Sequence, residues 1–108
     1  MMYEQSLKID LFKMEELFKS YQGKPVTIFV KGTITLAIPI KSFDWRHWDD
    51  EVCFGEEEMQ DDWFCINKDE LVSIHTDYDL MGSEDKVIFE TVSDIFRTDI
   101  VVVYECMR

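Results

Sequence analysis

The chain opens with apolar residues at helical spacing. Between residues 6 and 22, five of them recur at intervals of four, three, four and three, which places them on one face of an α-helix. These residues are Leu7, Leu11, Met14, Phe18 and Tyr21. Ser6 or Asp10 is suited to cap the start, while Gly23 and Pro25 favour an end after residue 22. The pattern predicts an amphipathic helix at the N-terminus.

From residue 26 the apolar residues alternate with a period of two, as they do in β-strands. Two such segments, 26–31 and 33–40, meet at Gly32 and predict adjacent antiparallel strands. Pro39 lacks an N–H donor, so we expect it at a sheet edge or a bulge. Further strands are expected at Glu51–Phe54, Trp63–Asn67, Leu71–His75, Lys86–Thr91 and Asp99–Cys106. A helical turn is expected within 91–98 and a polar loop over 77–85.

One helix followed by five to seven short strands predicts an α+β fold. We expect an N-terminal amphipathic helix packed on an antiparallel, partly barrel-like sheet. The length of 108 residues suits a single domain spanning 1–108. The apolar content of 46% can form a core without disulfides or metals.

The stretch 23–74 resembles the Sm/LSm family of small barrels. The residues that carry the resemblance are Val26, Ile28, Val30, Gly32 and the Phe43-Asp44 pair in the first motif, and Ile66, Leu71 and Ile74 in the second. The resemblance implies a helix before a strongly bent five-stranded sheet. It does not extend to RNA binding, because Asn67 and Lys68 stand where the family has Arg-Gly.

The charge of the chain is strongly negative and uneven. There are 23 acidic and 11 basic residues, a net charge of −12. Residues 1–41 hold six basic and four acidic residues (+2), and residues 42–108 hold five basic and nineteen acidic residues (−14). Direct binding to nucleic acids or anionic membranes is disfavoured, because both are bound through lysine and arginine. A basic protein, or the basic nucleic-acid-binding groove of a protein, would instead be attracted.

The negative charge is densest between residues 44 and 62, where nine carboxylates are opposed only by Arg46. Tryptophans are interleaved with the acids and could anchor an interface. The candidate partner-binding residues are Asp44, Trp45, Trp48, Asp49, Asp50, Glu51, Glu56, Glu57, Glu58, Asp61, Asp62 and Trp63. Carboxylates on a rigid frame can imitate a nucleic-acid backbone, as in small phage or mobile-element proteins that block DNA-cutting enzymes. The alternative is a solvated surface that keeps the protein soluble, with the aromatic rings in the core.

Other chemistry has little support in the sequence. The cysteines Cys53, Cys65 and Cys106 show no CxxC spacing, so we expect free thiols in a reducing cytoplasm and neither a disulfide framework nor a zinc site. His47 with Asp49 is a weak metal motif, and no catalytic context surrounds the cysteines or His75. The first residues lack the apolar run of a signal peptide, and no apolar segment is long enough to span a membrane.

The sequence therefore predicts a cytoplasmic, non-enzymatic acidic binding protein without a cofactor or metal. Its most concrete form is a nucleic-acid-mimicking inhibitor of a DNA- or RNA-binding enzyme. The alternative is a homo-oligomeric small-barrel structural or assembly protein, whose acidic surface only solubilises it. Such an oligomer could associate through the apolar face of the helix or through 101–104 as an edge strand.

Overall fold

The computed structural model describes residues 6–78, 84–93 and 96–104. The elements in these ranges are β1 (Ser6–Ile9), α1 (Leu11–Tyr21), β2 (Val26–Lys31), β3 (Thr35–Ile40), β4 (Phe43–His47), β5 (Glu51–Glu56), the 3-10 helix η2 (Gln60–Asp62), β6 (Phe64–Asn67), the 3-10 helix η3 (Lys68–Glu70), β7 (Leu71–Tyr78), β8 (Glu84–Ser93) and β9 (Phe96–Tyr104). One helix and antiparallel strands confirm the α+β prediction.

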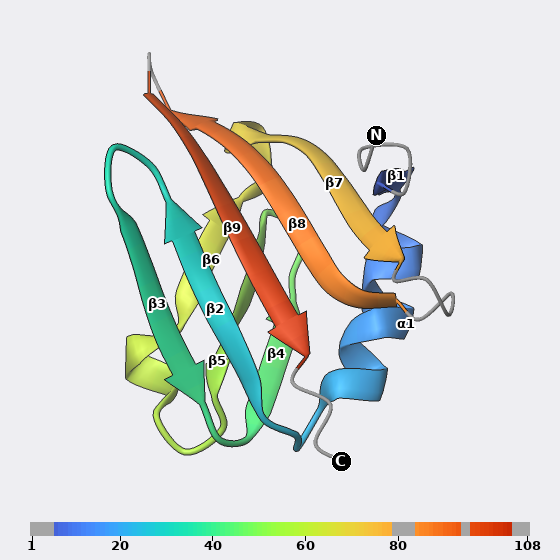
Figure 1. The fold of residues 1–108 in the computed structure, drawn as a ribbon, viewed down its shortest axis with the longest axis vertical. Coiled ribbons are helices and arrows are strands. Elements are labelled where there is room, and N and C mark those ends of the chain that lie inside the picture. The colour runs from blue at the N-terminus through green and yellow to red at the C-terminus, as the bar shows by residue number, and fades with distance from the viewer. Residues whose placement is uncertain (1–5, 79–83, 94–95, 105–108) are drawn as a thin grey trace.

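The strands form two sheets. Six strands pair in the order β1-β7-β8-β9-β2-β3, and three pair in the order β4-β5-β6. Figure 1 shows the six-stranded sheet in front, the three-stranded sheet behind it and α1 at one side. The described strands therefore form two separate sheets, and they do not close into the barrel that the sequence suggested.

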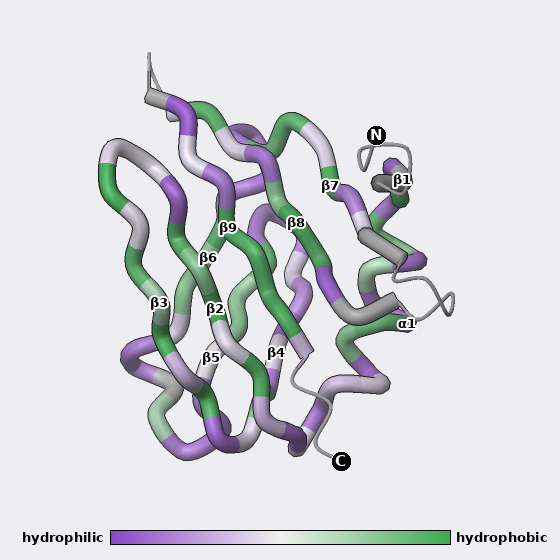
Figure 2. The backbone as a smooth tube through the Cα atoms, in the orientation of Figure 1, coloured by the Kyte–Doolittle hydropathy of each residue, from purple (hydrophilic) through white to green (hydrophobic). Residues whose placement is uncertain are grey.

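The core lies between the two sheets and α1. Phe18 of α1 is fully buried, with ring centroids 5.0 Å from Phe43, 5.6 Å from Phe54 and 5.9 Å from Phe89. Because these partners come from both sheets, one helical side chain joins all three layers. The apolar segments of the large sheet run along β2, β8 and β9 (Figure 2).

The start and end of α1 follow from local chemistry. Asp10 caps the start, since its Oδ1 accepts a hydrogen bond of 2.8 Å from the backbone N–H of Lys13. Gly23 follows the helix with φ of 77°, a conformation that glycine adopts without strain. The prediction that the helix is N-terminal is wrong, because residues 6–9 form β1, which pairs with β7 through Ile9 and Ile74.

Most predicted strands are present, with shifted ends. β2 and β3 pair as expected, and β3 is an edge strand, which confirms the position of Pro39. Strands β1 and β4 were not predicted from the sequence. The expected helical turn within 91–98 is wrong for its described residues, because Thr91 of β8 pairs with Thr98 of β9. The expected loop over 77–85 is wrong at both ends, because residues 77–78 belong to β7 and residues 84–85 to β8, and residues 79–83 lie outside the described ranges.

Two expected routes to self-association are also corrected. Residues 101–104 belong to β9, which lies between β8 and β2 and is not an edge strand. The apolar face of α1 is used internally, because Met14, Phe18 and Tyr21 are buried in the core. No helix among the described residues is both long and apolar enough to cross a membrane.

Candidate functional site

The acidic segment of residues 44–62 is divided by the three-stranded sheet into two groups. Residues 48–50 form the turn between β4 and β5, and residues 57–63 connect β5 to β6. These loops leave opposite ends of β5, a strand of six residues that spans about 17 Å. The exposed carboxylates therefore form two groups, and they do not form the single patch that the sequence suggested.

The larger group lies on the connection between β5 and β6. Four of its carboxylates are exposed: Glu57, Glu58, Asp61 and Asp62. They surround a shallow hollow of about 510 Å³ together with Met59, whose side chain is 54% exposed. Backbone hydrogen bonds of 3.0 Å from Met59 to Glu56 and from Asp62 to Met59 hold the connection in shape. We call residues 56–62 the acidic connection.

Two predicted site residues are structural acids. Asp44 is 6% exposed, and its Oδ1 accepts hydrogen bonds from the backbone N–H of Trp45 at 2.8 Å and from Arg46 at 3.0 Å. Glu56 accepts hydrogen bonds from the backbone N–H groups of Lys41 at 2.8 Å and Ser42 at 3.0 Å. These carboxylates hold the loop between β3 and β4 and the start of β4, so they are poorly placed to meet a partner.

The three tryptophans have different roles. Trp45 packs into the core, with its ring centroid 5.8 Å from that of Phe18. Trp63 lies against Gly55 and donates a hydrogen bond of 2.6 Å from Nε1 to the carbonyl of Glu56. Trp48 is 51% exposed and is the one tryptophan of the three that presents a large face to solvent.

Trp48 belongs to the smaller acidic group, at the opposite end of β5. Its backbone N–H donates to the carbonyl of Glu51 at 2.9 Å, which closes the turn that exposes Asp49 and Asp50. The carbonyl of Asp50 accepts a hydrogen bond of 2.9 Å from the N–H of Lys68 at the start of η3. This group places two carboxylates beside one aromatic ring, with Glu51 half-buried behind them.

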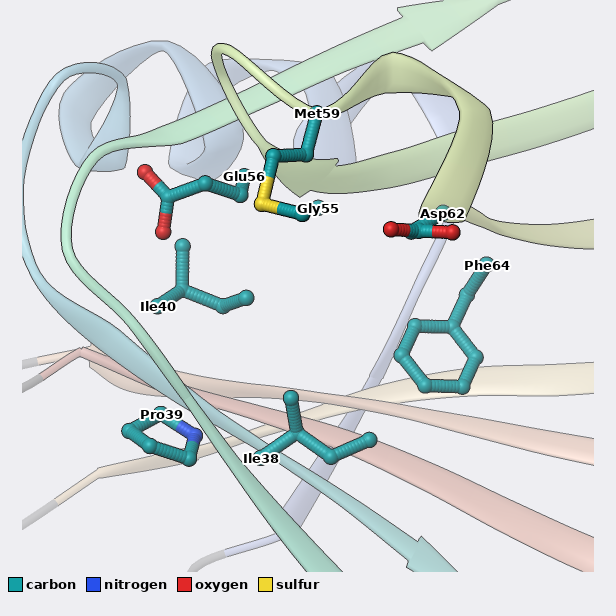
Figure 3. A pocket seen from close by; sticks show the side chains of 8 residues that line it. All are labelled: Ile38, Pro39, Ile40, Gly55, Glu56, Met59, Asp62 and Phe64. Carbon is teal, nitrogen blue, oxygen red and sulfur yellow. The ribbon is translucent and has the colours of Figure 1, made fainter.

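An apolar pocket lies beside the acidic connection, between the edge strand of the large sheet and the small sheet. It has a volume of about 350 Å³ and is lined by Ile38, Pro39, Ile40, Gly55, Glu56, Met59, Asp62 and Phe64. Figure 3 shows the apolar side chains of β3 facing Met59 and Phe64, with the carboxylates of Glu56 and Asp62 at the rim. The sequence does not reveal this pocket, because its walls come from segments that pair in different sheets.

The structure corrects the expectation of free thiols for two of the three cysteines. Cys53 of β5 and Cys65 of β6 face one another in the strand register and form a disulfide, with Cα atoms 4.1 Å apart. Cys53 is buried and Cys65 is exposed. The sequence separation of 12 residues does not reveal this pairing, which depends on the return of the chain through the acidic connection. Cys106 lies outside the described residues.

Among the described residues, the histidines form no cluster of three or more metal-binding side chains. His47 Nδ1 lies 2.7 Å from Glu15 Oε2 on α1, and Asp49 is exposed in the neighbouring turn. His47 pairs with Val52 in the register, so its side chain lies on the opposite face of the sheet from that of Cys53. The histidine and cysteine of a nucleophile–base pair therefore do not meet here.

A serine, a histidine and a glutamate meet on the outer face of the large sheet. Ser73 Oγ donates to Glu90 Oε1 at 2.7 Å, and it lies 3.0 Å from Nε2 of His75. The hydrogen bond from Ser73 is the largest influence and lowers the pKa of Glu90; desolvation by burial opposes it, and the nearby charge of Arg97 lowers the pKa further. Because the single hydroxyl proton of Ser73 is directed at Glu90, the arrangement is not that of a serine activated by a histidine base.

Comparisons with known proteins provide no relative. No family model matches the chain, no curated protein matches it, and no solved structure matches its fold. The resemblance to the Sm/LSm pattern therefore stays a prediction.

Proposed function

We propose that the protein is a non-enzymatic acidic binding protein whose acidic connection receives a basic segment of a protein partner. The observation that carries the proposal is the apolar pocket of about 350 Å³ that adjoins the exposed carboxylates of the connection. Charge attracts and orients a partner, whereas an apolar anchor buried in a pocket supplies most of the affinity. The proposed site offers both, because the acidic connection, the edge strand β3 and the flanking Gly55 and Phe64 lie around one pocket.

The pocket defines the chemistry of the segment that would fit. Its apolar walls, Ile38, Ile40, Met59 and Phe64, suit an aliphatic or aromatic side chain. The rim carboxylate of Asp62 and the adjacent Glu58 and Asp61 suit lysine or arginine beside that anchor. A basic groove of a DNA- or RNA-binding enzyme presents lysine and arginine beside apolar side chains. This match supports the proposal that the protein is an inhibitor that competes with nucleic acid for such a groove.

Charge-reversal variants at the two ends of β5 provide a matched test. The double variant Glu57→Lys/Asp61→Lys alters the acidic connection, and Asp49→Lys/Asp50→Lys makes the same change at the opposite end. All four residues are exposed, so neither variant should unfold the domain, and the change at 57 also removes a surface hydrogen bond of 2.7 Å that Ser42 Oγ donates to Glu57. The immobilised wild-type protein is incubated with a host lysate, and retained proteins are eluted by rising salt and by duplex DNA.

We expect the wild-type protein to retain a nucleic-acid-binding protein that is released by salt and by DNA. The change at 57 and 61 should weaken this retention by about tenfold or more, and Met59→Asp should weaken it without reversing any charge. The change at 49 and 50 should have a much smaller effect. Equal retention by all variants would contradict the proposed site. A retained partner that duplex DNA does not release would contradict the proposal that the protein mimics nucleic acid.

A second candidate function is self-assembly through β3. β3 is an edge strand of the large sheet, and Ile34 and Leu36 beside and within it are 69% and 51% exposed. Apolar edge strands can pair with a second copy. Light-scattering mass would then rise with protein concentration in the wild type and remain that of one chain in Leu36→Lys. A mass of one chain in both proteins would exclude this route.

A further inference from the structure

The outer face of the three-stranded sheet brings two cysteines and a carboxylate together. Glu51 and Cys53 are two residues apart on β5, so their side chains lie on the same face of the sheet. Cys65 of β6 is directly opposite Cys53. One carboxylate oxygen of Glu51 and the two Sγ atoms all lie within 4.8 Å of one another. This is the one group of three or more such side chains at ligand spacing among the described residues.

We propose that Glu51, Cys53 and Cys65 bind a thiophilic divalent cation of the Zn²⁺ class when the disulfide is reduced. A dithiol reductant supplies two electrons and two protons, so that the S–S bond breaks and two thiols form while the reductant becomes a disulfide. The cation then displaces the two thiol protons and binds two thiolates and the Glu51 carboxylate. The disulfide is thus the oxidised, metal-free form of the same site.

The geometry requires only local adjustment. Zinc–sulfur bonds are about 2.3 Å and zinc–oxygen bonds about 2.0–2.2 Å, so ligand atoms around one tetrahedral ion lie roughly 3.3–3.8 Å apart. Reduction lets the two sulfurs separate to this distance, and a side-chain rotation brings the Glu51 oxygen closer from within 4.8 Å. Three protein ligands leave a fourth position for water or for a group of another molecule.

The surroundings give the cation access and do not cancel the charge of the ligands. The three residues border a cavity of about 240 Å³, and Arg46, Trp48 and Trp63 line the rest of it. Arg46 would repel a cation, but its guanidinium forms an ion pair of 3.0 Å with the buried Asp44. The two tryptophans add apolar surface to the cavity wall, which strengthens the attraction between the ligands and the ion.

The test measures metal binding in the full chain with Cys106→Ser as a common background, so that two thiols remain. The protein is prepared with the disulfide intact and after reduction, and each form is titrated with Zn²⁺ against a chromogenic chelator. Co²⁺ serves as a second probe, because its absorption reports thiolate ligands and tetrahedral geometry. Circular dichroism checks the fold of every sample.

We expect the reduced protein to bind one Zn²⁺ per chain and the oxidised protein to bind none at the same concentration. Cys65→Ser and Glu51→Gln should each weaken binding by more than about tenfold. Asp69→Asn, which removes one exposed negative charge near the same end of β5, should bind like the background protein. Co²⁺ should give thiolate charge-transfer absorption only in the reduced protein.

Three results would overturn the proposal. A folded, reduced protein that does not bind Zn²⁺ excludes the site. Equal affinity in Glu51→Gln and Asp69→Asn removes the carboxylate from it. Binding that persists in the oxidised protein assigns the metal to another part of the chain. If Cys53→Ser does not fold, the variants at Glu51 and Cys65 still decide the question, because neither of those side chains is buried in the core.

Discussion

Gly55 holds the start of the acidic connection against β6, and its replacement by alanine would disrupt that contact. The added Cβ would lie 2.7 Å from Cδ1 of Trp63 and 3.2 Å from its Cα. Rotation of the indole can relieve the first contact but not the second, which is with the backbone. Gly55→Ala must therefore move the start of β6 or the end of β5.

The expected loss of stability combines two effects. Overpacking at a filled position costs about 1–3 kcal/mol. Movement of Trp63 also breaks the 2.6 Å hydrogen bond from its Nε1 to the carbonyl of Glu56, which contributes about 1 kcal/mol. The free energy of unfolding of Gly55→Ala should therefore fall by about 2–4 kcal/mol, measured by urea denaturation followed by circular dichroism.

Gly32 provides the matched control. An added Cβ there would meet only Thr98 Oγ1, at 3.7 Å, and Gly32 does not have a positive φ. Gly32→Ala should change stability by less than about 1 kcal/mol. In a double-mutant cycle, Trp63→Ala should relieve the part of the effect of Gly55→Ala that comes from the indole, with a coupling energy above about 1 kcal/mol, and leave the part that comes from the backbone contact. Equal stability of the two alanine variants, or additive effects at 55 and 63, would refute the reasoning.

Three further predictions concern the helix and the outer sheet face. Phe18→Ala should lower the free energy of unfolding by about 3–5 kcal/mol, whereas Phe12→Ala, at a position 72% exposed, should change it by less than about 0.5 kcal/mol in the same urea titration. Asp10→Ala should lower the thermal midpoint by removing a cap of about 1 kcal/mol, and Asp10→Asn should retain most of it. The lowered pKa of Glu90 means that its contribution to stability is present above the ordinary value of 4.5 and is lost as pH falls through the lowered pKa. The difference in unfolding free energy between wild type and Glu90→Gln should therefore shrink on acidification, and a constant difference would contradict the stabilisation of the carboxylate by Ser73 and Arg97.

The local pattern of apolar and polar residues was sufficient to predict most of the helices and strands. The period-two alternation and Gly32 correctly predict the pairing of β2 and β3, and of the two candidate helix caps, Ser6 and Asp10, the structure uses Asp10. β4 was missed because residues 43–47 alternate two aromatic residues with charged ones, and the charges were interpreted as part of the acidic segment that could bind a partner. The division into two sheets was not predictable, because alternation specifies which face of a strand is buried but not which strand it pairs with.

The candidate site was predicted in part. Charge density correctly identifies the exposed carboxylates of the connection, but composition cannot distinguish them from Asp44 and Glu56, whose oxygens accept backbone hydrogen bonds. The apolar pocket and the Cys53–Cys65 pair depend on contacts between segments distant in the chain. Both could have been found only by knowing that β5 reverses into β6 and that β3 faces the same connection.

The position of β9 has a consequence for synthesis of the protein on the ribosome. β9 lies between β2 and β8 in the large sheet. The middle of this sheet can therefore form only after β9 is available to pair with β2, from Val26 with Tyr104 to Lys31 with Asp99. Because chains emerge from the amino end first, β2 and β3 leave the ribosome as a hairpin whose inner edge is unpaired. That edge is exposed to other nascent chains until residues 96–104 have emerged. Pairing strands this distant in sequence also favours slow folding, so the interval before residues 96–104 have emerged is the period of greatest risk of aggregation.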